Sequence, residues 1–295
     1  MKQYDTFIIG HLSIDEIVEM DGTEEILMGG AIVHAAYTAV MTGNRTGICI
    51  KTGKKEKAVA YLLPVPHDDI YWRESGAGTT SIRNVYLDEN HERRTTKALV
   101  HADGITAREI PADIDTKVFH MAGLIRGDFE DEMIRALSLR SKVALDVQGI
   151  LRAADMTSGA MEYHDWEAKK EYLPYVTYLK TDAAEAEILT GFTDRRQAAK
   201  QMRDWGAKEV MITHHDEVLV YDGETFYTCP LKPRSLAGRT GRGDTTFSAY
   251  ITERQRADIQ ASLDFAAQLV SLKMETPGPF KGSRAQVLAF AKTCY

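Results

Sequence analysis

The sequence has few of the features that mark specialised protein classes. Its 295 residues include only three cysteines, Cys49, Cys229 and Cys294, an odd number without CxxC spacing. This count indicates neither a disulfide framework nor a zinc site. No apolar run is long enough to span a bilayer, and no block of lysine or arginine occurs in this chain of net charge −7. We therefore expect no membrane partner and no nucleic-acid partner, since both nucleic acids and anionic membranes require a basic surface.

The N-terminus also lacks the charged and then apolar layout of a signal peptide, because residues 1–5 lead directly into the short apolar segment 6–10. This arrangement predicts a cytoplasmic protein. The composition is that of an ordinary globular protein, with 44% hydrophobic and 27% charged residues. Such a chain can bury a sizeable core.

Short apolar runs alternate with segments of helical periodicity along most of the chain. This alternation predicts a mostly parallel sheet with helices on both faces, in which ligands bind beyond the carboxyl ends of the strands. We expect one domain spanning residues 1–295. The expected strands are 7–9, 46–50, 118–121, 142–147, 178–180 and 209–213, and the expected helices are 32–41, 130–139, 183–189 and 195–205.

Two segments depart from this alternation. Residues 81–100 predict a β-hairpin with a polar turn at 88–91, and residues 14–28 are also strand-like around a turn at Asp21-Gly22. The four short strands predict either a small sheet that projects as a lid or an antiparallel extension of the main sheet. Periodicity does not distinguish the two arrangements.

The most informative segment is GRTGRGDTTF at residues 238–247. Gly241 and Gly243 allow the backbone to turn tightly beside a ligand, and a helix is expected to begin near Asp244. Backbone N–H groups at a helix N-terminus bind anions, and an adjacent carboxylate can take a proton from an attacking hydroxyl. The pattern suits phosphoryl transfer to a hydroxyl, although Asp and Thr are also ordinary helix caps.

Five segments, in order along essentially the whole chain, resemble the PfkB, or ribokinase-like, family of carbohydrate kinases. They are GHLSID at 10–15, GGAIVHAA at 29–36, the hairpin at 80–94, LKTDAAE at 179–185 and GRGD at 241–244. The resemblance implies a ribokinase-like three-layer α/β/α sandwich, with a central sheet of about nine strands and a small β lid. It also implies ATP as the phosphoryl donor, together with Mg²⁺, and leaves open whether a monovalent cation is needed.

The resemblance assigns roles to particular residues. Asp244 would be the catalytic base, and the amides of Gly241, Arg242 and Gly243 would hold the transferring phosphate. Asp15 would bind two substrate hydroxyls, and Glu185 would bind Mg²⁺ through water. The further expected substrate contacts are Gly29, Gly30, His34, Arg126, Gln148 and Arg152, and the expected nucleotide contacts are Lys180, Asp182, Thr213, Arg239 and Thr240.

The sequence departs from the family pattern at four places. Arg242 lies within the expected anion hole, where a small residue is common, and Arg239 precedes it, so that either would add a cation near the phosphates. His34 and Asp182 stand where an asparagine is usual, and Ile212-Thr213-His214-His215 replaces the usual Val-Thr-x-Gly of the nucleotide segment. Loss of that glycine should alter how the backbone approaches the donor.

The acceptor hypothesis depends on DVQG at 146–149, which is followed by Arg152 and resembles the inositol-kinase branch of the family. We therefore expect a small-molecule acceptor that is an inositol-like cyclic polyol. A furanose sugar, a nucleoside or a sugar phosphate are alternative acceptors, and a sensor that binds without turnover is a further alternative. An NAD-binding oxidoreductase is rejected, because no GxGxxG follows the first strand.

The oligomeric state stays open at this stage. Family members often pair through the lid, and the apolar residues Ile82, Val85 and Leu87 are compatible with a homodimer. They are equally compatible with a lid that covers only its own site.

Overall fold

The computed structural model describes residues 1–88 and 93–295, and its centre is a nine-stranded sheet within those residues. The strand order is β15-β14-β13-β12-β9-β8-β1-β4-β5, and neighbours from β13 to β5 are parallel. The strands are β1 Lys2–His11, β4 Thr46–Thr52, β5 Ile70–Glu74, β8 Ile114–Ala122, β9 Lys142–Asp146, β12 Tyr178–Asp182, β13 Glu209–Thr213, β14 Glu217–Tyr221 and β15 Phe226–Pro230. The last two strands pair antiparallel at one edge.

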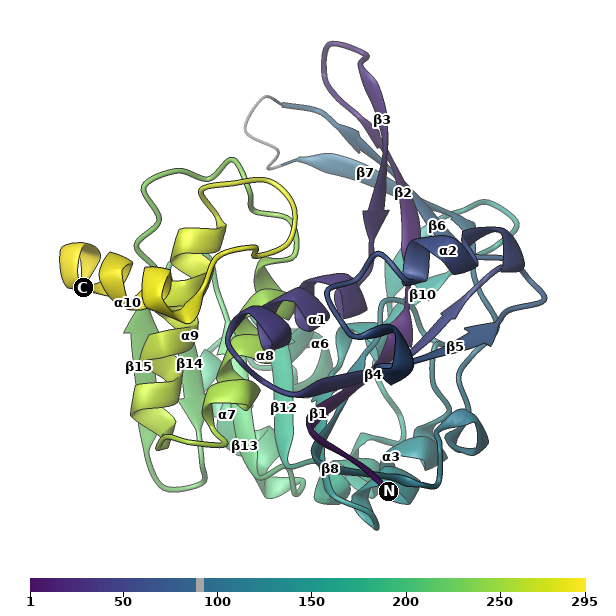
Figure 1. The fold of residues 1–295 in the computed structure, drawn as a ribbon. Coiled ribbons are helices and arrows are strands. Elements are labelled where there is room, and N and C mark those ends of the chain that lie inside the picture. The colour runs from purple at the N-terminus through teal and green to yellow at the C-terminus, as the bar shows by residue number, and fades with distance from the viewer. Residues whose placement is uncertain (89–92) are drawn as a thin grey trace.

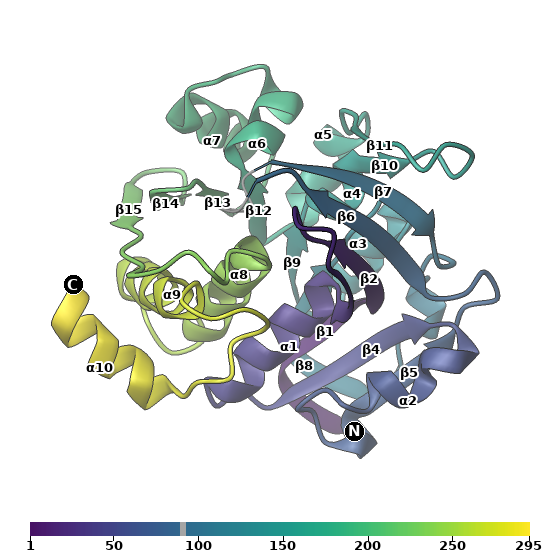
Figure 2. The same ribbon diagram turned by 90° about the horizontal axis from the view of Figure 1, so that it is seen from above.

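Helices cover both faces of this sheet (Figure 2). On β1, Phe7 and Ile9 point into one core and Ile8 into another, as the two-residue period of a strand requires. The first face packs against α3 Asp131–Ser138, α6 Ala183–Thr190 and α7 Arg195–Asp204, and the second against α1 Ala31–Met41, α8 Arg242–Glu253 and α9 Ile259–Lys273. The remaining helices are α2 Lys57–Ala60, α4 Gln148–Leu151, α5 Lys169–Tyr172 and α10 Arg284–Cys294, with short 3₁₀ turns at Lys54–Glu56, His67–Asp69, Ala107–Glu109 and Leu173–Tyr175.

The direction in which the chain crosses the sheet reverses beside β1. From β1 the chain proceeds to β4 and β5 on one side, and it then returns to β8 on the other side before continuing to β9 and β12. In open α/β sheets, ligands bind beyond the carboxyl ends of the strands at such a reversal. The position predicts where the functional site lies.

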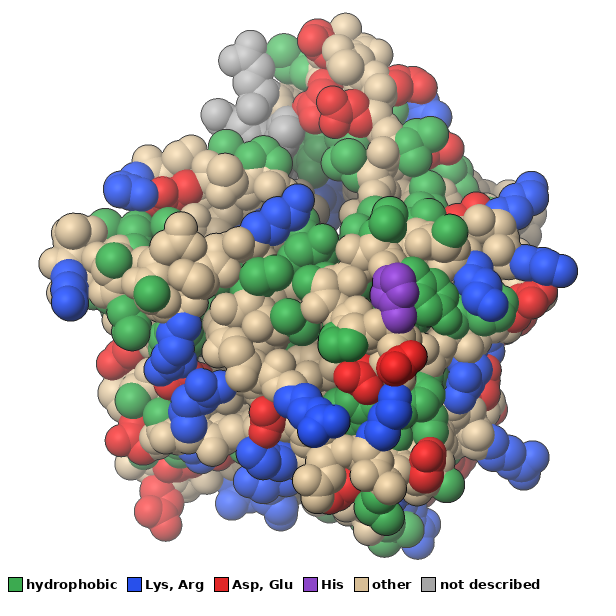
Figure 3. Space-filling view, in the orientation of Figure 1, with side chains coloured by type: hydrophobic (Ala, Val, Ile, Leu, Met, Phe, Trp, Pro, Cys, Tyr) green, Lys and Arg blue, Asp and Glu red, His purple; other side chains and the backbone are tan. Residues whose placement is uncertain are grey.

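A second, four-stranded sheet projects above this edge (Figure 1). Its order is β3-β2-β6-β7, from β2 Ser13–Val18, β3 Glu24–Gly29, β6 Thr80–Tyr86 and β7 Arg94–Val100. The two strand-like segments of the sequence therefore form a lid separate from the main sheet, and not an extension of it. The visible face of the lid carries hydrophobic and acidic side chains (Figure 3). The polar turn expected at 88–91 lies outside the described residues except for Asp88.

The observed architecture confirms the expected fold class. Each expected strand and helix is present with bounds that differ by a few residues at most, except that β1 and β8 begin earlier than expected. A short hairpin, β10 Arg152–Ala154 with β11 Met161–Tyr163, was not expected and bridges to the lid through Lys97 and Ala160. Among the described residues, no helix combines the length and hydrophobicity that crossing a bilayer requires.

Candidate active site

The N-terminus of α8 forms the base of the site. Gly241 precedes the helix with φ +75°, a left-handed conformation that favours glycine. A Cβ on Gly241 would also lie 2.2 Å from the ring of His34, so space and conformation both require glycine here. The N–H of Arg242 donates to Arg239 O at 3.1 Å, and the N–H groups that follow it in the first turn of α8 have no intrahelical acceptor and are available to an anion.

The imidazole ring of His34 packs against this loop. Its side chain is buried in α1, and burial lowers its pKa to about 3, so the imidazole is neutral. Its Nδ1 atom has no hydrogen-bond partner among the described residues. The structure places His34 against Gly241, and not among the residues that line the adjacent cavity.

A cluster of charged side chains lies where β9, β12 and α8 meet. Lys180 Nζ is 3.0 Å from Asp146 Oδ2 and 3.8 Å from Glu185 Oε2, and all three side chains are buried. Burial raises the pKa of Asp146, of Asp244 and of Glu185, the last to about 7. Lys180 lowers all three of these pKa values, and its own pKa is raised by the same carboxylates against the effect of burial.

Asp182 and Glu185 also have a local structural role. The backbone N–H of Glu185 donates to Asp182 Oδ1 at 2.8 Å, and the backbone N–H of Asp182 donates to Glu185 Oε2 at 2.7 Å. This reciprocal pair is a capping box at the start of α6. The box fixes both carboxyl groups at the carboxyl end of β12, beside Lys180.

The cluster has the chemistry of a Mg²⁺ site. Four carboxylates, those of Asp146, Asp182, Glu185 and Asp244, surround the single ammonium group of Lys180, and three of them have raised pKa values. Mg²⁺ prefers carboxylate oxygens and retains several waters. The excess negative charge therefore fits a hydrated divalent cation.

A cavity of about 320 Å³ opens beside the N-terminus of α8. Its wall contains four cationic residues, Arg94 from the lid and Lys180, Arg239 and Arg242 from the body. Burial lowers the pKa of Arg242, and the neighbouring charge of Arg239 lowers it further, so these two guanidinium groups are close enough to repel each other. A polyanion bound here would relieve that repulsion. The other lining residues are Tyr86, Gln148, Asp182, Thr213, Leu236, Ala237, Thr240, Gly241, Gly243 and Asp244.

Asp15 approaches the same region from the lid. Burial raises its pKa to about 6, and its Oδ1 atom is buried without a hydrogen-bond partner among the described residues. Gly29 packs against it so closely that a Cβ there would lie 2.2 Å from Asp15 Oδ2. The charge of Arg152 lowers the pKa of both Asp15 and Asp244. The charge of Arg152 therefore acts on both the lid carboxylate and the helix carboxylate, and its Nε donates to Leu124 O at 2.8 Å.

Arg126 is not brought into this group. Its Nε donates to Ile150 O at 2.6 Å, and one terminal nitrogen donates to the backbone oxygens of His164 and Asp165. It lines a different cavity, next to Trp166, and is tied to the backbone of that segment. Gly30 is the residue that precedes α1, and its φ of +105° is a left-handed conformation that favours glycine at the start of this helix.

Sequence reasoning did not select Arg94, Tyr86, Asp146 or Lys273 as site residues. Tyr86 and Arg94 lie opposite each other in the lid hairpin and line the cavity. Their only sequence signal was membership of that hairpin. Asp146 could have been found, because it ends β9 at the carboxyl edge of the sheet. Lys273 carries no sequence signal, since it lies far along the chain in α9.

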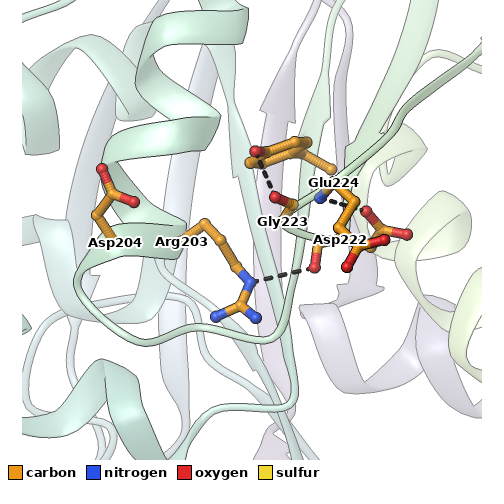
Figure 4. Close-up of a pocket in the computed structure, with 6 residues that line it drawn as sticks. Arg203, Asp204, Asp222, Gly223 and Glu224 are labelled. Atoms are coloured by element: carbon orange, nitrogen blue, oxygen red, sulfur yellow. Dashed lines mark hydrogen bonds between the residues drawn. The ribbon is translucent and has the colours of Figure 1, made fainter.

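A larger cavity, of about 630 Å³, lies between α7 and the turn that joins β14 to β15 (Figure 4). Its polar groups bond to one another: Arg203 Nε donates to Asp222 O at 3.1 Å, and Tyr221 OH donates to Gly223 O at 2.7 Å. None of its lining residues lines the cavity beside α8. We do not assign it a function.

Three comparisons bear on this site. The family described as pfkB family carbohydrate kinase matches residues 33–284. The chain is 28% identical over 267 residues to a cytidine kinase of Thermococcus kodakarensis, covering 85% of this chain and 89% of that protein.

Two solved structures are more similar. One is a pyrophosphate-dependent kinase in the ribokinase family complexed with a pyrophosphate analog and myo-inositol. It is 33% identical, with a TM-score of 0.85, and the match covers 96% of this chain and 99% of that one. The other is a pyrophosphate-dependent myo-inositol-1 kinase that a double substitution converts into a myo-inositol-3 kinase. It is 32% identical, with a TM-score of 0.84, and the match covers 98% of each chain.

Proposed function

This chain belongs to the pfkB family of carbohydrate kinases, enzymes that transfer a phosphoryl group to a hydroxyl, and we propose that its acceptor is an inositol-like cyclic polyol. The observation that carries the proposal is Asp15, whose buried Oδ1 lacks a hydrogen-bond partner among the described residues and whose pKa is lowered by the same Arg152 charge that lowers the pKa of Asp244. A polyol offers neighbouring hydroxyls that can satisfy this carboxylate while another hydroxyl reaches Asp244. The myo-inositol complex of the 33% identical structure supports this choice.

In the proposed reaction, Asp244 accepts the proton of the attacking hydroxyl. Burial raises the pKa of Asp244, which makes its carboxylate a stronger base than an exposed aspartate. The acceptor oxygen forms a bond to the terminal phosphorus of the donor as the bridging P–O bond breaks, and the remaining phosphate leaves with its bonding electrons. The amides of Gly241 and Gly243 stabilise the negative charge of the transferring group, whereas that of Arg242 donates to Arg239 O, and Arg152, whose charge acts on both Asp15 and Asp244, contacts the acceptor.

Mg²⁺ would neutralise charge on the donor oxygens, and Asp182 and Glu185 would hold it through water. Their capping-box bonds keep both carboxyl groups oriented whether or not the ion is bound. Lys180 would contact the donor phosphates from the same side. Gln148, Thr213 and Thr240 line the cavity and complete the proposed contacts.

We propose pyrophosphate as the donor, with ATP, which the family resemblance implies, as the alternative. Arg239 and Arg242 place two mutually repelling cations beside the anion-binding helix terminus, a suitable environment for a ligand whose charge is concentrated on two phosphates. The two solved structures reported above, which are 33% and 32% identical, are described as pyrophosphate-dependent. His214 and His215, at the end of β13, also replace the glycine usual for the nucleotide segment.

The test is a two-way panel of donors and acceptors. Pyrophosphate and ATP are each assayed with Mg²⁺ against myo-inositol, other polyols, furanose sugars and cytidine, and phosphorylated product is measured directly. We expect turnover with myo-inositol or a stereoisomer, and a kcat/KM for pyrophosphate at least ten times that for ATP. Asp244→Asn should lower kcat by roughly 100- to 10,000-fold, as expected for loss of a general base. The exposed Asp204→Asn is the matched control and should keep wild-type turnover.

Three outcomes would contradict parts of the proposal. A preference for cytidine would move the acceptor to a nucleoside, in line with the 28% identical cytidine kinase. Binding of donor and polyol without any product would support the sensor alternative. Near-wild-type turnover by Asp244→Asn would show that the assigned base is wrong.

A further inference from the structure

Lys273 is a buried lysine in contact with the loop that forms the anion site. It is the last residue of α9, and its side chain is 2% exposed. Its Nζ donates to the backbone oxygen of Gly238 at 2.5 Å and also to that of Thr240. The backbone N–H of Gly238 donates in turn to Met274 O at 2.7 Å. The C-terminal end of α9 is therefore hydrogen-bonded to the segment that leads into the N-terminus of α8.

The bond to Thr240 determines where the next amide points. In a trans peptide the C=O and N–H point in opposite directions. The peptide whose oxygen is that of Thr240 carries the N–H of Gly241. Because the ammonium group fixes this oxygen on the α9 side, it turns the Gly241 N–H away from α9, and Gly241 is one of the residues that line the cavity at the start of α8.

The charge of Lys273 also reaches the reacting groups. It lowers the pKa of Asp244 and of His34. Burial lowers the pKa of Lys273 itself to about 8, while the Asp244 carboxylate acts in the opposite direction. The side chain is therefore an ammonium ion at neutral pH, buried next to the proposed phosphoryl site.

A bound monovalent cation would likewise place a positive charge against backbone oxygens, since backbone carbonyls can replace the hydration shell of K⁺. The ammonium group of Lys273 already occupies the backbone oxygens of Gly238 and Thr240. A free K⁺ or Na⁺ at the same oxygens would be repelled by it. The residues therefore do not fit a separate monovalent cation at this position.

We propose that Lys273 is the built-in monovalent cation of the anion site, a positioning residue that orients the Gly241 amide and makes turnover independent of K⁺, Na⁺ or NH₄⁺. This inference rests on the proposed function, because it assigns a role within the same site. It differs from a purely structural role, in which Lys273 would only fasten the loop to α9. A structural role predicts no specific response to cations.

The experiment compares wild type, Lys273→Met and Lys281→Met in buffers of equal ionic strength. The buffers contain tetramethylammonium, which is too large for the site, K⁺ or NH₄⁺. Lys281 is an exposed lysine eight residues along the chain and serves as the matched control. The readouts are kcat/KM, the melting temperature, and the Kd for sulfate, which probes the anion site without any turnover.

We expect wild type and Lys281→Met to give the same values, within twofold, in all three buffers. In tetramethylammonium, Lys273→Met should bind sulfate at least tenfold more weakly and lose at least 100-fold in kcat/KM. K⁺ or NH₄⁺ should raise both the sulfate affinity and the kcat/KM of Lys273→Met at least tenfold, and should raise the melting temperature of this variant. Lys273→Gln, which keeps a hydrogen-bond donor without the charge, provides the same comparison if the methionine variant does not fold.

Several results would overturn the inference. One is a wild-type kcat/KM that rises several-fold on replacing tetramethylammonium with K⁺. Another is a folded Lys273 variant whose sulfate binding equals that of wild type, or whose loss no cation restores. If wild type turns over no acceptor, the proposed function fails, whereas sulfate binding and melting temperature still decide the role of Lys273.

Discussion

Asp15, Asp146, Glu185 and Asp244 share one property, which is a pKa raised mainly by burial. A carboxyl group whose pKa is higher in the folded than in the unfolded state favours folding at low pH and opposes it once ionised. The site therefore destabilises the fold near neutral pH. Bound hydroxyls would supply the partner that Asp15 Oδ1 lacks among the described residues, and Mg²⁺ would offset the excess negative charge around Lys180.

Asp15 gives a prediction at this scale, because its pKa of about 6 lies within an accessible range. Above pH 6 its carboxylate accepts hydrogen bonds from acceptor hydroxyls, and as pH falls through 6 it gains a proton and loses that capacity. We expect kcat/KM for the acceptor to fall below pH 6 in wild type. Asp15→Asn should lower kcat/KM throughout and abolish this inflection, which a pH profile from 5 to 8 at saturating donor measures.

Stability measurements check the same group without turnover. A shift from 3.8 to about 6 corresponds to at most about 3 kcal/mol when Asp15 is fully ionised. Asp15→Asn should therefore be more stable than wild type at pH 8, with the difference vanishing near pH 4. An inflection near pH 6 that persists in the variant would assign it to another group.

The lid is an element whose two faces have different roles. Asp15 pairs with Ile82 across β2 and β6, and Ile82 pairs with Ala98, so these three side chains share the face directed at the site. Val85 has the opposite parity in β6, and Ile82 is only 5% exposed. Ile82, Val85 and Leu87 therefore do not form one patch for pairing through the lid. Dimerisation through the lid stays a prediction.

Arg94 and Arg93 give a matched pair for testing the lid. Both side chains are exposed, but Arg94 lines the donor cavity with its guanidinium 3.4 Å from Tyr86 OH, whereas Arg93 pairs with Asp88. We expect Arg94→Ala to lower kcat/KM for the donor at least tenfold, because it removes the cation that the lid adds to the cavity. Arg93→Ala should stay within twofold of wild type. Equal effects of the two variants in steady-state kinetics would contradict a specific role for Arg94.

Asp128 holds the lid and the body together at the scale of the whole molecule. His11 ends β1 just before the lid begins, and His101 follows β7 just after the lid ends. Asp128 Oδ1 lies 3.0 Å from His101 Nε2 and 3.5 Å from His11 Nδ1, while Oδ2 accepts from the backbone N–H groups of Leu124 and Ile125. Two crossings between body and lid therefore meet at one buried carboxylate.

The pKa of Asp128 gives the sign of its contribution. Burial would raise this pKa, but His11, His101 and the N–H groups outweigh it and hold the pKa below its ordinary value of 3.8. Asp128 therefore stabilises the fold at pH values above 3.8, and the contribution is lost as pH falls below that value. We expect Asp128→Asn to lower the free energy of unfolding by about 3 kcal/mol at pH 7.

Urea unfolding from pH 7 down to pH 3 measures this prediction, with the exposed Asp115→Asn as control. The difference between wild type and Asp128→Asn should shrink toward the acid end. A difference that stays constant to pH 3 would show that the ionised carboxylate is not the source of the effect.

The sequence by itself determined those features of the protein that depend on residues close together in the chain. Strand and helix periodicity, the glycine at φ +75° and the helix that begins after it are local, and each appeared where the sequence predicted it. The family resemblance had the same origin, since each of its motifs is a short segment. Even the D-x-x-E at 182–185 was visible, although as a capping box it has a structural reason as well as the expected functional one.

Only the tertiary structure decided which distant residues meet. The charge of Arg152 acts on both Asp15 and Asp244, while Arg126, equally plausible in sequence, is bound to backbone oxygens elsewhere. Lys273 reaches the anion loop because α9 packs beside α8, and the lid is a separate sheet because β2 pairs with β6 across about seventy residues. Side-chain contacts of this kind depend on how whole elements pack, and the pattern within one segment carries no information about the segment that will lie against it.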